Sequence, residues 1–385
     1  MEKWSYAKIG DVCTVERGGS PRPIDKFITD DPNGINWIKI GDTTDSMYIT
    51  ETAQKIIPEG MKKSRYVQPG DFLLSNSMSF GRPYILRIDG CIHDGWLVLR
   101  DNEGVFDKRF LYYYLSSPST YQKFKNMAVG GVVNNLNSDM VRGVTVPVPK
   151  MEEQIEIVQT LDNVSNLISL RKQQLAKLDQ LVKSRFIELF GDPVYNNDGL
   201  PTKKLRELGS LDRGRSQHRP RNDPKLLNGP YPLIQTGEVA SAGLYITEYK
   251  NTYSELGLQQ SKMWKAGTLC ITIAANIAQT AILTFDACFP DSVVGFVPND
   301  AVSAIYMHYW FGFFQKILEE QAPQVAQKNI NLKILSDLDV MVPKKEHQEQ
   351  FAAFVEQTDK SKLAIQKSLD KLELLKKSLM QQYFG

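Results

Sequence analysis

A long stretch of the chain, from Met151 to Phe190, has the apolar spacing of a helix that packs along its whole length. An apolar repeat of seven residues runs through it, formed by Leu161, Ile168, Leu175, Val182 and Leu189, and Val164, Leu178 and Leu181 are placed on the same face. Such a repeat indicates a helix paired with another helix. Because no Pro or Gly interrupts the stretch, it predicts a rod of roughly 58 Å, too long for the interior of one compact domain.

A second stretch of the same kind closes the chain, from about Glu346 to Phe384. Its apolar residues at helical spacing are Ile365, Leu369, Leu372, Leu375, Leu379 and Tyr383. Two such helices can cover each other's apolar faces, whereas separate rods would leave both faces exposed. The pattern favours an antiparallel coiled coil within one chain, with pseudo-twofold symmetry and a globular half at each end. Packing of each helix on its own half, or self-association, is the alternative.

The first 145 residues predict a globular α+β domain with many short strands. Strands are expected at 35–40, 84–88 and 95–99, and the turn signal Pro69-Gly70-Asp71 precedes another apolar run. A helix over 106–124 is expected to break near Pro118. A Pro-flanked strand, Val146-Pro147-Val148-Pro149, then leads into the first long helix.

After Gly191 the sequence motifs of the first half recur in the same order, and this repeat is the most informative pattern in the sequence. Arg213-Gly214-Arg215-Ser216 restates Arg17-Gly18-Gly19-Ser20, Asn329-Ile330-Asn331 restates Asn135-Leu136-Asn137, and Phe384-Gly385 restates Phe190-Gly191. The matches keep their order, and their offset drifts by a few residues because of small insertions and deletions in loops. The sequence therefore predicts a tandem duplication of a mixed α/β domain plus a long helix. The expected segments are a domain at 1–149, a helix at 150–191, a domain at 192–343 and a helix at 344–385.

Composition narrows the class of protein. The chain has 385 residues, of which 42% are hydrophobic, so folded cores are expected. Its formal net charge of +2 is nearly neutral, and any nucleic-acid binding must come from local patches. The four cysteines lie far apart without a CxxC pair, which favours reduced thiols in a cytoplasmic protein. No apolar run approaches about 18 residues, so a membrane span is not expected.

Motifs for catalysis are missing from the sequence. There is no GxxxxGK[ST] or GxGxxG run, no Asn/Asp-Pro-Pro-aromatic signature, and the four histidines have no metal-ligand spacing. Asp94 and Asp291 occupy equivalent positions in the two halves. Paired acidic residues can indicate metal-dependent hydrolysis, but no Glu-x-Lys motif follows either aspartate. A structural role for both aspartates is therefore favoured. We expect a chain that is not an enzyme and binds no metal or cofactor of its own.

Basic loops at equivalent places in both halves are the main candidate for a binding site. Residues 201–225 hold eight Lys or Arg against three acidic residues. The candidate DNA-binding residues are Arg213, Arg215, Gln217, His218, Arg219 and Arg221 in the second half, and Arg17, Ser20, Arg22 and Lys26 in the first. Arginine forks bind phosphate and guanine edges, and Gln or Asn reads adenine. A solvated basic loop is the alternative, but two similar basic lobes favour a bipartite DNA reader.

Two further pairs of loops carry amide, hydroxyl or basic groups that can reach base edges. The candidates are Asn76, Ser77 and Arg82, matched by Asn276 and Gln279, and Asn134 and Asn135, matched by Lys328 and Asn329. Asn and Ser are also ordinary turn residues, and the second pair of loops can equally cap the element that follows.

One signature runs from Asn135-Leu136-Asn137 through Val146-Pro147-Val148-Pro149 to Glu153-Gln154. It recurs from Asn329-Ile330-Asn331 through Val342-Pro343 to His347-Gln348. With this repeated signature, the whole chain resembles the specificity subunit of type I restriction-modification systems. The second half departs from the pattern at Met341, which replaces a proline, and at Ala266 before Gly267. These departures suggest a different half-site preference.

The resemblance implies two target-recognition domains that each read one half of a split sequence in double-stranded DNA. It also implies that the two helices set the spacer and dock two modification subunits for adenine methylation, with restriction subunits joining afterwards. S-adenosylmethionine, ATP and Mg²⁺ would belong to those partners. Two rivals are a coiled-coil adaptor with two protein-binding lobes, and a solitary methyltransferase or nuclease, against which the missing motifs argue.

Overall fold

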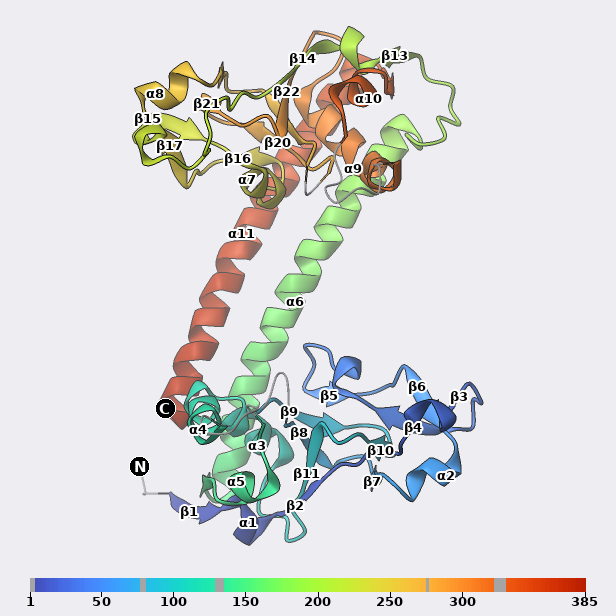
Figure 1. Ribbon diagram of the computed structural model, residues 1–385, viewed down its shortest axis with the longest axis vertical. Helices are drawn as coiled ribbons and strands as arrows, with labels where there is room; N and C mark the ends of the chain where they lie inside the picture. The colour runs from blue at the N-terminus through green and yellow to red at the C-terminus, as the bar shows by residue number, and fades with distance from the viewer. Residues whose placement is uncertain (1–3, 77–80, 129–134, 275–276, 322–329) are drawn as a thin grey trace. The chain divides into compact units, whose positions relative to one another are not determined.

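A computed structural model describes residues 4–76, 81–128, 135–274, 277–321 and 330–385 of the chain (Figure 1). Internal contacts divide the chain into two compact units: unit 1 contains Met1–Lys172 and Lys367–Gly385, and unit 2 contains Gln173–Gln366. Each unit therefore holds one lobe of sheets and short helices together with a part of both long helices. The division into four segments by sequence stays a prediction.

The lobe of unit 1 consists of short strands and short helices. Its strands are β1 (Ser5–Lys8), β2 (Thr14–Arg17), β3 (Ile28–Thr29), β4 (Ile35–Ile38), β5 (Tyr48–Ile49), β6 (Gln54–Ile56), β7 (Arg65–Val67), β8 (Phe72–Ser75), β9 (Pro83–Leu86), β10 (Gly90–Ile92), β11 (Trp96–Arg100) and β12 (Thr145–Val148). Its helices are α1 (Ile9–Val12), α2 (Pro58–Met61), α3 (Lys108–Leu115), α4 (Pro118–Ala128) and α5 (Ser138–Arg142), with 3-10 turns η1 (Ile24–Lys26) and η2 (Ile40–Asp42). The expected break near Pro118 is confirmed, because α4 begins there.

The lobe of unit 2 is built in the same way. Its strands are β13 (Thr202–Lys204), β14 (Gly209–Arg213), β15 (Leu227–Leu233), β16 (Tyr245–Ile246), β17 (Asn251–Tyr253), β18 (Met263–Trp264), β19 (Leu269–Thr272), β20 (Thr280–Leu283), β21 (Ala287–Cys288), β22 (Val293–Pro298) and β23 (Asp339–Met341). Its helices are α7 (Thr236–Ser241), α8 (Glu255–Gln259), α9 (Ala304–Gln321) and α10 (Leu332–Ser336), with 3-10 turns η3 (Leu205–Glu207) and η4 (Pro224–Leu226).

The order of strands in the sheets confirms the duplication. One sheet of the first lobe is ordered β2-β11-β8-β9-β5, and its counterpart in the second lobe is β14-β22-β19-β20-β16. The pair β1-β12 likewise corresponds to β13-β23. The remaining sheets are β3-β6-β4-β10-β7 and β17-β15-β21-β18, and they differ by the edge strand β3. Strands that are far apart in the sequence thus pair in the same order in both lobes. Local periodicity alone does not require this.

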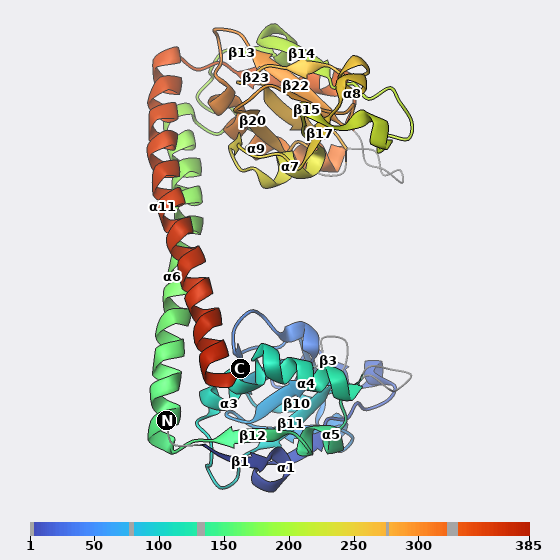
Figure 2. The same cartoon turned by 90° about the vertical axis from the view of Figure 1, so that its left-hand side faces the viewer.

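Both long helices form where the apolar repeat predicts them. The first, α6 (Met151–Phe190), begins two residues after Pro149, and the second, α11 (Lys345–Phe384), begins two residues after Pro343. Gly191 follows α6 with a φ of 73°, a left-handed conformation that ends helices without a Cβ clash. Figure 2 shows α6 and α11 in a second view. No described helix is both long enough and apolar enough to cross a membrane.

Within each unit the two helices run antiparallel. In unit 1, Leu161 near the start of α6 shares a core with Phe384 at the end of α11. In unit 2, Phe186 near the end of α6 shares a core with Phe351 near the start of α11, and their ring centroids lie 5.4 Å apart. The predicted intramolecular pairing of the helices is confirmed.

The residues on the pairing face are largely those expected from the repeat. The predicted positions that are buried or half-buried are Leu161, Ile168, Leu175, Leu178, Val182, Leu189, Ile365, Leu369, Leu372 and Leu379. Leu181 and Leu375 were placed on this face wrongly, since they are 49% and 45% exposed. A paired seam advances by three and then four residues, so the position after Leu178 falls on Val182.

A buried glutamine fixes the first turn of each long helix to its lobe. The Gln154 side-chain amide donates to the carbonyl oxygens of Val105 and Pro149 at 2.9 and 3.0 Å, and its Oε1 accepts the Asp107 N–H at 2.9 Å. Gln348 repeats this arrangement with Ala301, Pro343 and Ser303 at 2.9, 3.0 and 2.9 Å. Each amide is thus bonded at both its nitrogen and its oxygen, which makes its burial tolerable.

We predict that Gln154→Leu lowers the free energy of unfolding by about 3 kcal/mol, because it leaves one N–H and two carbonyl groups buried without partners. Urea unfolding monitored by circular dichroism measures the change. The matched control is Gln159→Leu, an exposed glutamine on the same helix, for which a change within about 0.5 kcal/mol is expected. Equal effects of the two substitutions would contradict the role given to Gln154.

Candidate functional site

The basic loops of the two lobes leave equivalent strands in the same way. Arg17 ends β2, which pairs with β11, and Arg213 ends β14, which pairs with β22. The next residues, Gly18 and Gly214, each donate a backbone N–H at 2.9 Å, to a carbonyl oxygen in the neighbouring strand region. A Cβ on either glycine would collide with a backbone carbonyl oxygen, so only glycine permits this approach. A cis Arg-Pro bond follows in both loops.

Four of the predicted residues in the first lobe converge on Asp94. Ser20 Oγ donates to Asp94 Oδ1 at 2.8 Å, and Arg22 Nη2 lies 3.3 Å from Asp94 Oδ2. Arg17 Nε and Asn76 Nδ2 donate to the Asp94 carbonyl oxygen at 3.1 and 2.9 Å. The hydrogen bond from Ser20 lowers the pKa of Asp94, and neighbouring positive charge lowers it further. An ionised carboxylate therefore organises this loop, in agreement with the structural role expected for Asp94.

The burial of Asn76 corrects one prediction. Its side chain is 1% exposed, and its nitrogen is already bonded to the Asp94 carbonyl oxygen. A direct contact with a base edge is not available to this side chain in the structure. Asn76 instead supports the backbone on which Asp94 sits.

In the second lobe Asp291 takes the equivalent place. Arg221 Nη2 donates to Asp291 Oδ1 at 2.6 Å, and Arg219 Nη2 lies 3.7 Å from Asp291 Oδ2. The backbone of the loop is also held, because Gln260 Oε1 accepts the N–H groups of Gln217 and His218 at 2.7 and 3.1 Å. The loop is thus fixed by contacts from residues far along the chain.

Arg213 and Arg215 differ from the other arginines of this loop. Both side chains are exposed, and within the described part of the chain neither has a hydrogen-bond or ion-pair partner. Arg219 and Arg221 are engaged with Asp291, so the positive charge most available to an anion in this loop lies on Arg213 and Arg215.

The remaining predicted residues are not brought into one cluster with these loops. Lys26, Arg82 and Asn135 are exposed, and Gln279 is half-buried beside β20. Ser77, Asn134, Asn276, Lys328 and Asn329 lie outside the described residues. Nearby, Asn137 caps α5 and Asn331 caps α10, by accepting the N–H groups of Met140 and Ile334 at 2.8 and 2.9 Å. The capping alternative is therefore confirmed for these two asparagines.

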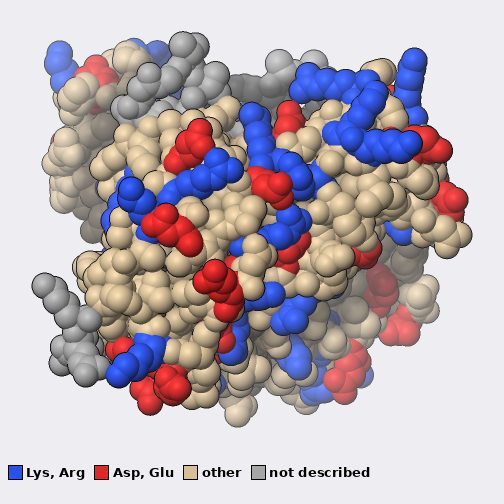
Figure 3. Space-filling view, turned by 90° about the horizontal axis from the view of Figure 1, so that it is seen from below, with Lys and Arg blue, Asp and Glu red and all other residues tan. Residues whose placement is uncertain are grey.

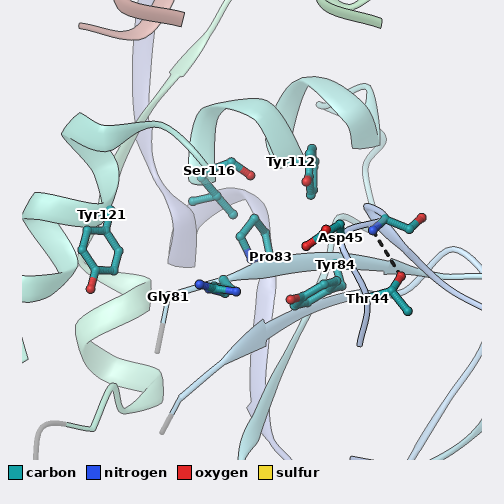
Figure 4. Close-up of a pocket in the computed structure, with 11 residues that line it drawn as sticks. Thr44, Asp45, Gly81, Pro83, Tyr84, Tyr112, Ser116 and Tyr121 are labelled. Carbon is teal, nitrogen blue, oxygen red and sulfur yellow. Dashed lines mark hydrogen bonds between the residues drawn. The ribbon is translucent and has the colours of Figure 1, made fainter. Parts of the chain in front are cut away.

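Arg82 lines a separate cavity of about 410 Å³ in the first lobe. Figure 4 shows Tyr84 and Asp45 on one side of this cavity and Tyr112, Ser116 and Tyr121 from the helical side. Burial raises the pKa of Tyr112. The lining of this cavity shares no residue with the cluster around Asp94.

A cavity also opens beside each basic loop, and it contains residues that the sequence analysis missed. In the first lobe a cavity of about 750 Å³ is lined by loop residues and by Trp37, Lys39 and His93. In the second lobe a cavity of about 350 Å³ includes Gln235 among its lining residues. Lys39 and Gln235 are 196 positions apart, so the repeat offset that relates Arg17 to Arg213 would have paired them.

Charge is mixed over the surface outside these loops. The face drawn in Figure 3 carries Lys and Arg side chains interspersed with Asp and Glu, as expected for a net charge of +2. Among the described residues, no group of three or more His, Cys, Asp or Glu side chains could hold a metal ion. Local loops, more than the whole surface, thus determine where an anion would bind.

Comparisons with known proteins agree on one family. Residues 1–180 and 197–376 both match the family model for the type I restriction modification DNA specificity domain. A putative type I restriction enzyme specificity subunit, MjaX of Methanocaldococcus jannaschii, is 22% identical over 412 residues, covering 98% of this chain and 92% of that one. The MjaIX specificity subunit of the same organism is 24% identical over 280 residues, covering 68% and 63%.

Solved structures share the fold over the full length of the chain. A chain from a study of complex assembly and conformational transition in the type I R-M system has a TM-score of 0.61 at 18% identity, covering 100% of this chain and 98% of its own length. The type I restriction-modification S subunit from M. genitalium has a TM-score of 0.58 at 13% identity, covering 100% and 96%.

We predict that Asp94→Ala loosens the first basic loop, because Arg22 and Ser20 lose their acceptor. Amide hydrogen exchange in residues 17–23 should become about tenfold faster, which corresponds to the loss of about 1.4 kcal/mol of local stability. Asp25→Ala is the control, since Asp25 is an exposed carboxylate of the same loop with no partner among the described residues. Exchange that is unchanged in Asp94→Ala would rule out the organising role of this carboxylate.

Proposed function

The chain belongs to the type I restriction-modification DNA specificity family, and we propose that each of its two lobes reads one half of a bipartite DNA site. The observation that carries this proposal is the repetition, in both lobes, of a glycine-anchored basic loop organised by an aspartate. Asp94 does this in the first lobe and Asp291 in the second. A repeated loop on a repeated scaffold is what two separate half-sites require.

The basic loops supply the chemistry for such contacts. Arg213 and Arg215 offer planar guanidinium groups that can form paired hydrogen bonds with phosphate or with a guanine edge. Arg17 and Arg22 hold the equivalent loop of the first lobe, and Arg22 can exchange its exposed ion pair with Asp94 for a phosphate. Because exposed ion pairs contribute little to stability, this exchange costs little.

The two long helices set the spacer between the half-sites in this proposal. Each is a single helix of 40 residues without an internal break. Paired helices resist bending more than a single one, so a rigid pair can act as a ruler. The cores at Phe384 in unit 1 and at Phe190 in unit 2 anchor the helix ends against the lobes.

Partner subunits would dock on the outer faces of the helices. Leu170, Leu363 and Leu374 are each more than half exposed, so these apolar side chains are accessible to a partner. We assign these faces to two modification subunits, which would bring S-adenosylmethionine for adenine methylation, and restriction subunits with ATP and Mg²⁺ would join them. This chain itself would be non-catalytic and, as a subunit acting on chromosomal DNA, would work in the cytoplasm.

Substitution of the free arginines tests the reading loop. Arg213→Ala or Arg215→Ala should weaken binding of the second half-site by about tenfold or more, because a bidentate contact contributes about 1–3 kcal/mol. Fluorescence anisotropy on specific duplexes, with the chain assembled with its modification subunits, measures this. Lys203→Ala, an exposed lysine on β13 outside the loop, is the matched control. Unchanged affinity in both arginine variants would eliminate this loop as the reader.

Lengthening both helices tests the ruler. One heptad inserted after Lys172 and another after Gln366 adds about 10 Å to each helix and keeps the pairing register. The recognised spacer should lengthen by about three base pairs, at roughly 3.4 Å each. Sequencing of methylated sites in a host carrying the variant and its modification subunit gives the spacer.

The control for the heptad is an equal insertion between Gly199 and Leu200, in the loop after α6, which should leave the spacer unchanged. An unaltered spacer after the helix insertions would contradict the ruler.

A further inference from the structure

The cavities beside the two basic loops are equivalent sites whose lining has diverged. Ser20 and Ser216 stand at the same position of the repeat, and each lines the cavity of its lobe. Among the equivalent lining positions that differ are Trp37 against Leu233, Lys39 against Gln235 and His93 against Pro290. The same framework thus presents different chemistry in the two lobes.

The backbone puts Lys39 and Gln235 at corresponding ends of parallel strand pairs. β4 runs parallel to β10 with Ile38 opposite Ile92, and Lys39 follows β4. β15 runs parallel to β21 with Leu233 opposite Cys288, and Gln235 lies two residues beyond the end of β15. Shortly after β10 and β21 the chain reaches Asp94 and Asp291, respectively. Each position therefore neighbours the carboxylate that holds an arginine of the basic loop.

Lys39 presents hydrogen-bond donors to the first cavity. Its Nζ donates to Gln54 Oε1 at 2.8 Å, which orients the half-buried side chain. An ammonium group has three donors and no acceptor, so two donors remain for a ligand. Guanine is the base that offers two acceptors, O6 and N7, side by side in the major groove, and lysine is a usual partner for them.

Gln235 presents both a donor and an acceptor to the second cavity. Its backbone N–H donates to Glu238 Oε2 at 3.2 Å, which fixes the residue at the start of α7. The exposed side-chain amide offers its nitrogen as a donor and its oxygen as an acceptor to a ligand. Adenine offers the complementary pair in the major groove, an N7 acceptor beside an N6 donor.

We infer that Lys39 and Gln235 are specificity-determining residues, and that Lys39 selects a guanine in the first half-site while Gln235 selects an adenine in the second. This inference rests on the proposed function, since it names the base that each reading lobe takes. Arg22 lines the same cavity as Lys39, and Arg221 lines the same cavity as Gln235. Their planar guanidinium groups suit paired hydrogen bonds with the phosphates next to the base that is read.

Reciprocal substitutions test the inference in the complete chain assembled with its modification subunits. The complex selects duplexes from a randomised DNA library, first with the wild-type chain and then with Lys39→Gln or Gln235→Lys. Lys39→Gln should change one preferred base of the first half-site from guanine to adenine, with a shift of about 10- to 100-fold in the preference ratio. Gln235→Lys should make the opposite change in the second half-site only.

Two exposed positions provide matched controls outside the cavities. Lys62→Gln and Gln259→Lys make the same chemical changes after α2 and at the end of α8, and both half-sites should stay as in the wild type. Circular dichroism checks that each variant is folded. Because the two lobes carry independent substitutions, misfolding of one variant leaves the other as a complete test.

The outcomes separate this inference from the proposed function. If the wild-type complex selects no bipartite sequence, the proposed function fails. If the wild-type complex selects one and both folded variants select the same bases, the inference about Lys39 and Gln235 is overturned while the proposed function stands. An equal loss of affinity for every sequence, with a smaller dependence on salt, would show a phosphate contact and would also overturn it.

Discussion

The contact on which the rest of the architecture depends is the buried glutamine at the start of each long helix. Gln154 and Gln348 each tie the first helical turn to three backbone groups of the preceding lobe. In an interior of low dielectric constant an unpaired amide is costly, so this geometry is strongly preferred over neighbouring ones. The first turn of each long helix is therefore fixed on the lobe that precedes it.

The far end of each helix is fixed by apolar packing. Phe190, at the end of α6, lies in the core of unit 2 with Phe351 and Tyr306, and Phe384, at the end of α11, lies in the core of unit 1 with Phe110. A helix that starts with a polar anchor and ends in a core has both termini held. The exposed ion pairs between the helices, such as Lys172 with Glu373, add little to this because they are solvated.

In the candidate reading loops, some arginines are held in ion pairs and others are free. Asp94 and Asp291 each hold an arginine in an exposed ion pair, which orders the loop. Arg213 and Arg215 stay available to an anion. A chain of nearly neutral net charge gains little long-range attraction for DNA, so such local cations have to provide the phosphate contacts. The diverged residues Lys39 and Gln235 then distinguish the bases.

The sequence by itself determined the features that depend on local periodicity and on order along the chain. The bounds of α6, the duplication and the positions of the basic loops follow from the apolar repeat, the proline flanks and the recurring motifs. Tertiary structure decided the rest. Asn76 is buried because its amide supports Asp94, and Leu181 is exposed because the seam passes to Val182. Which arginines are paired depends on a carboxylate some seventy residues away, which sheet pairing brings into reach and spacing along the sequence does not reveal.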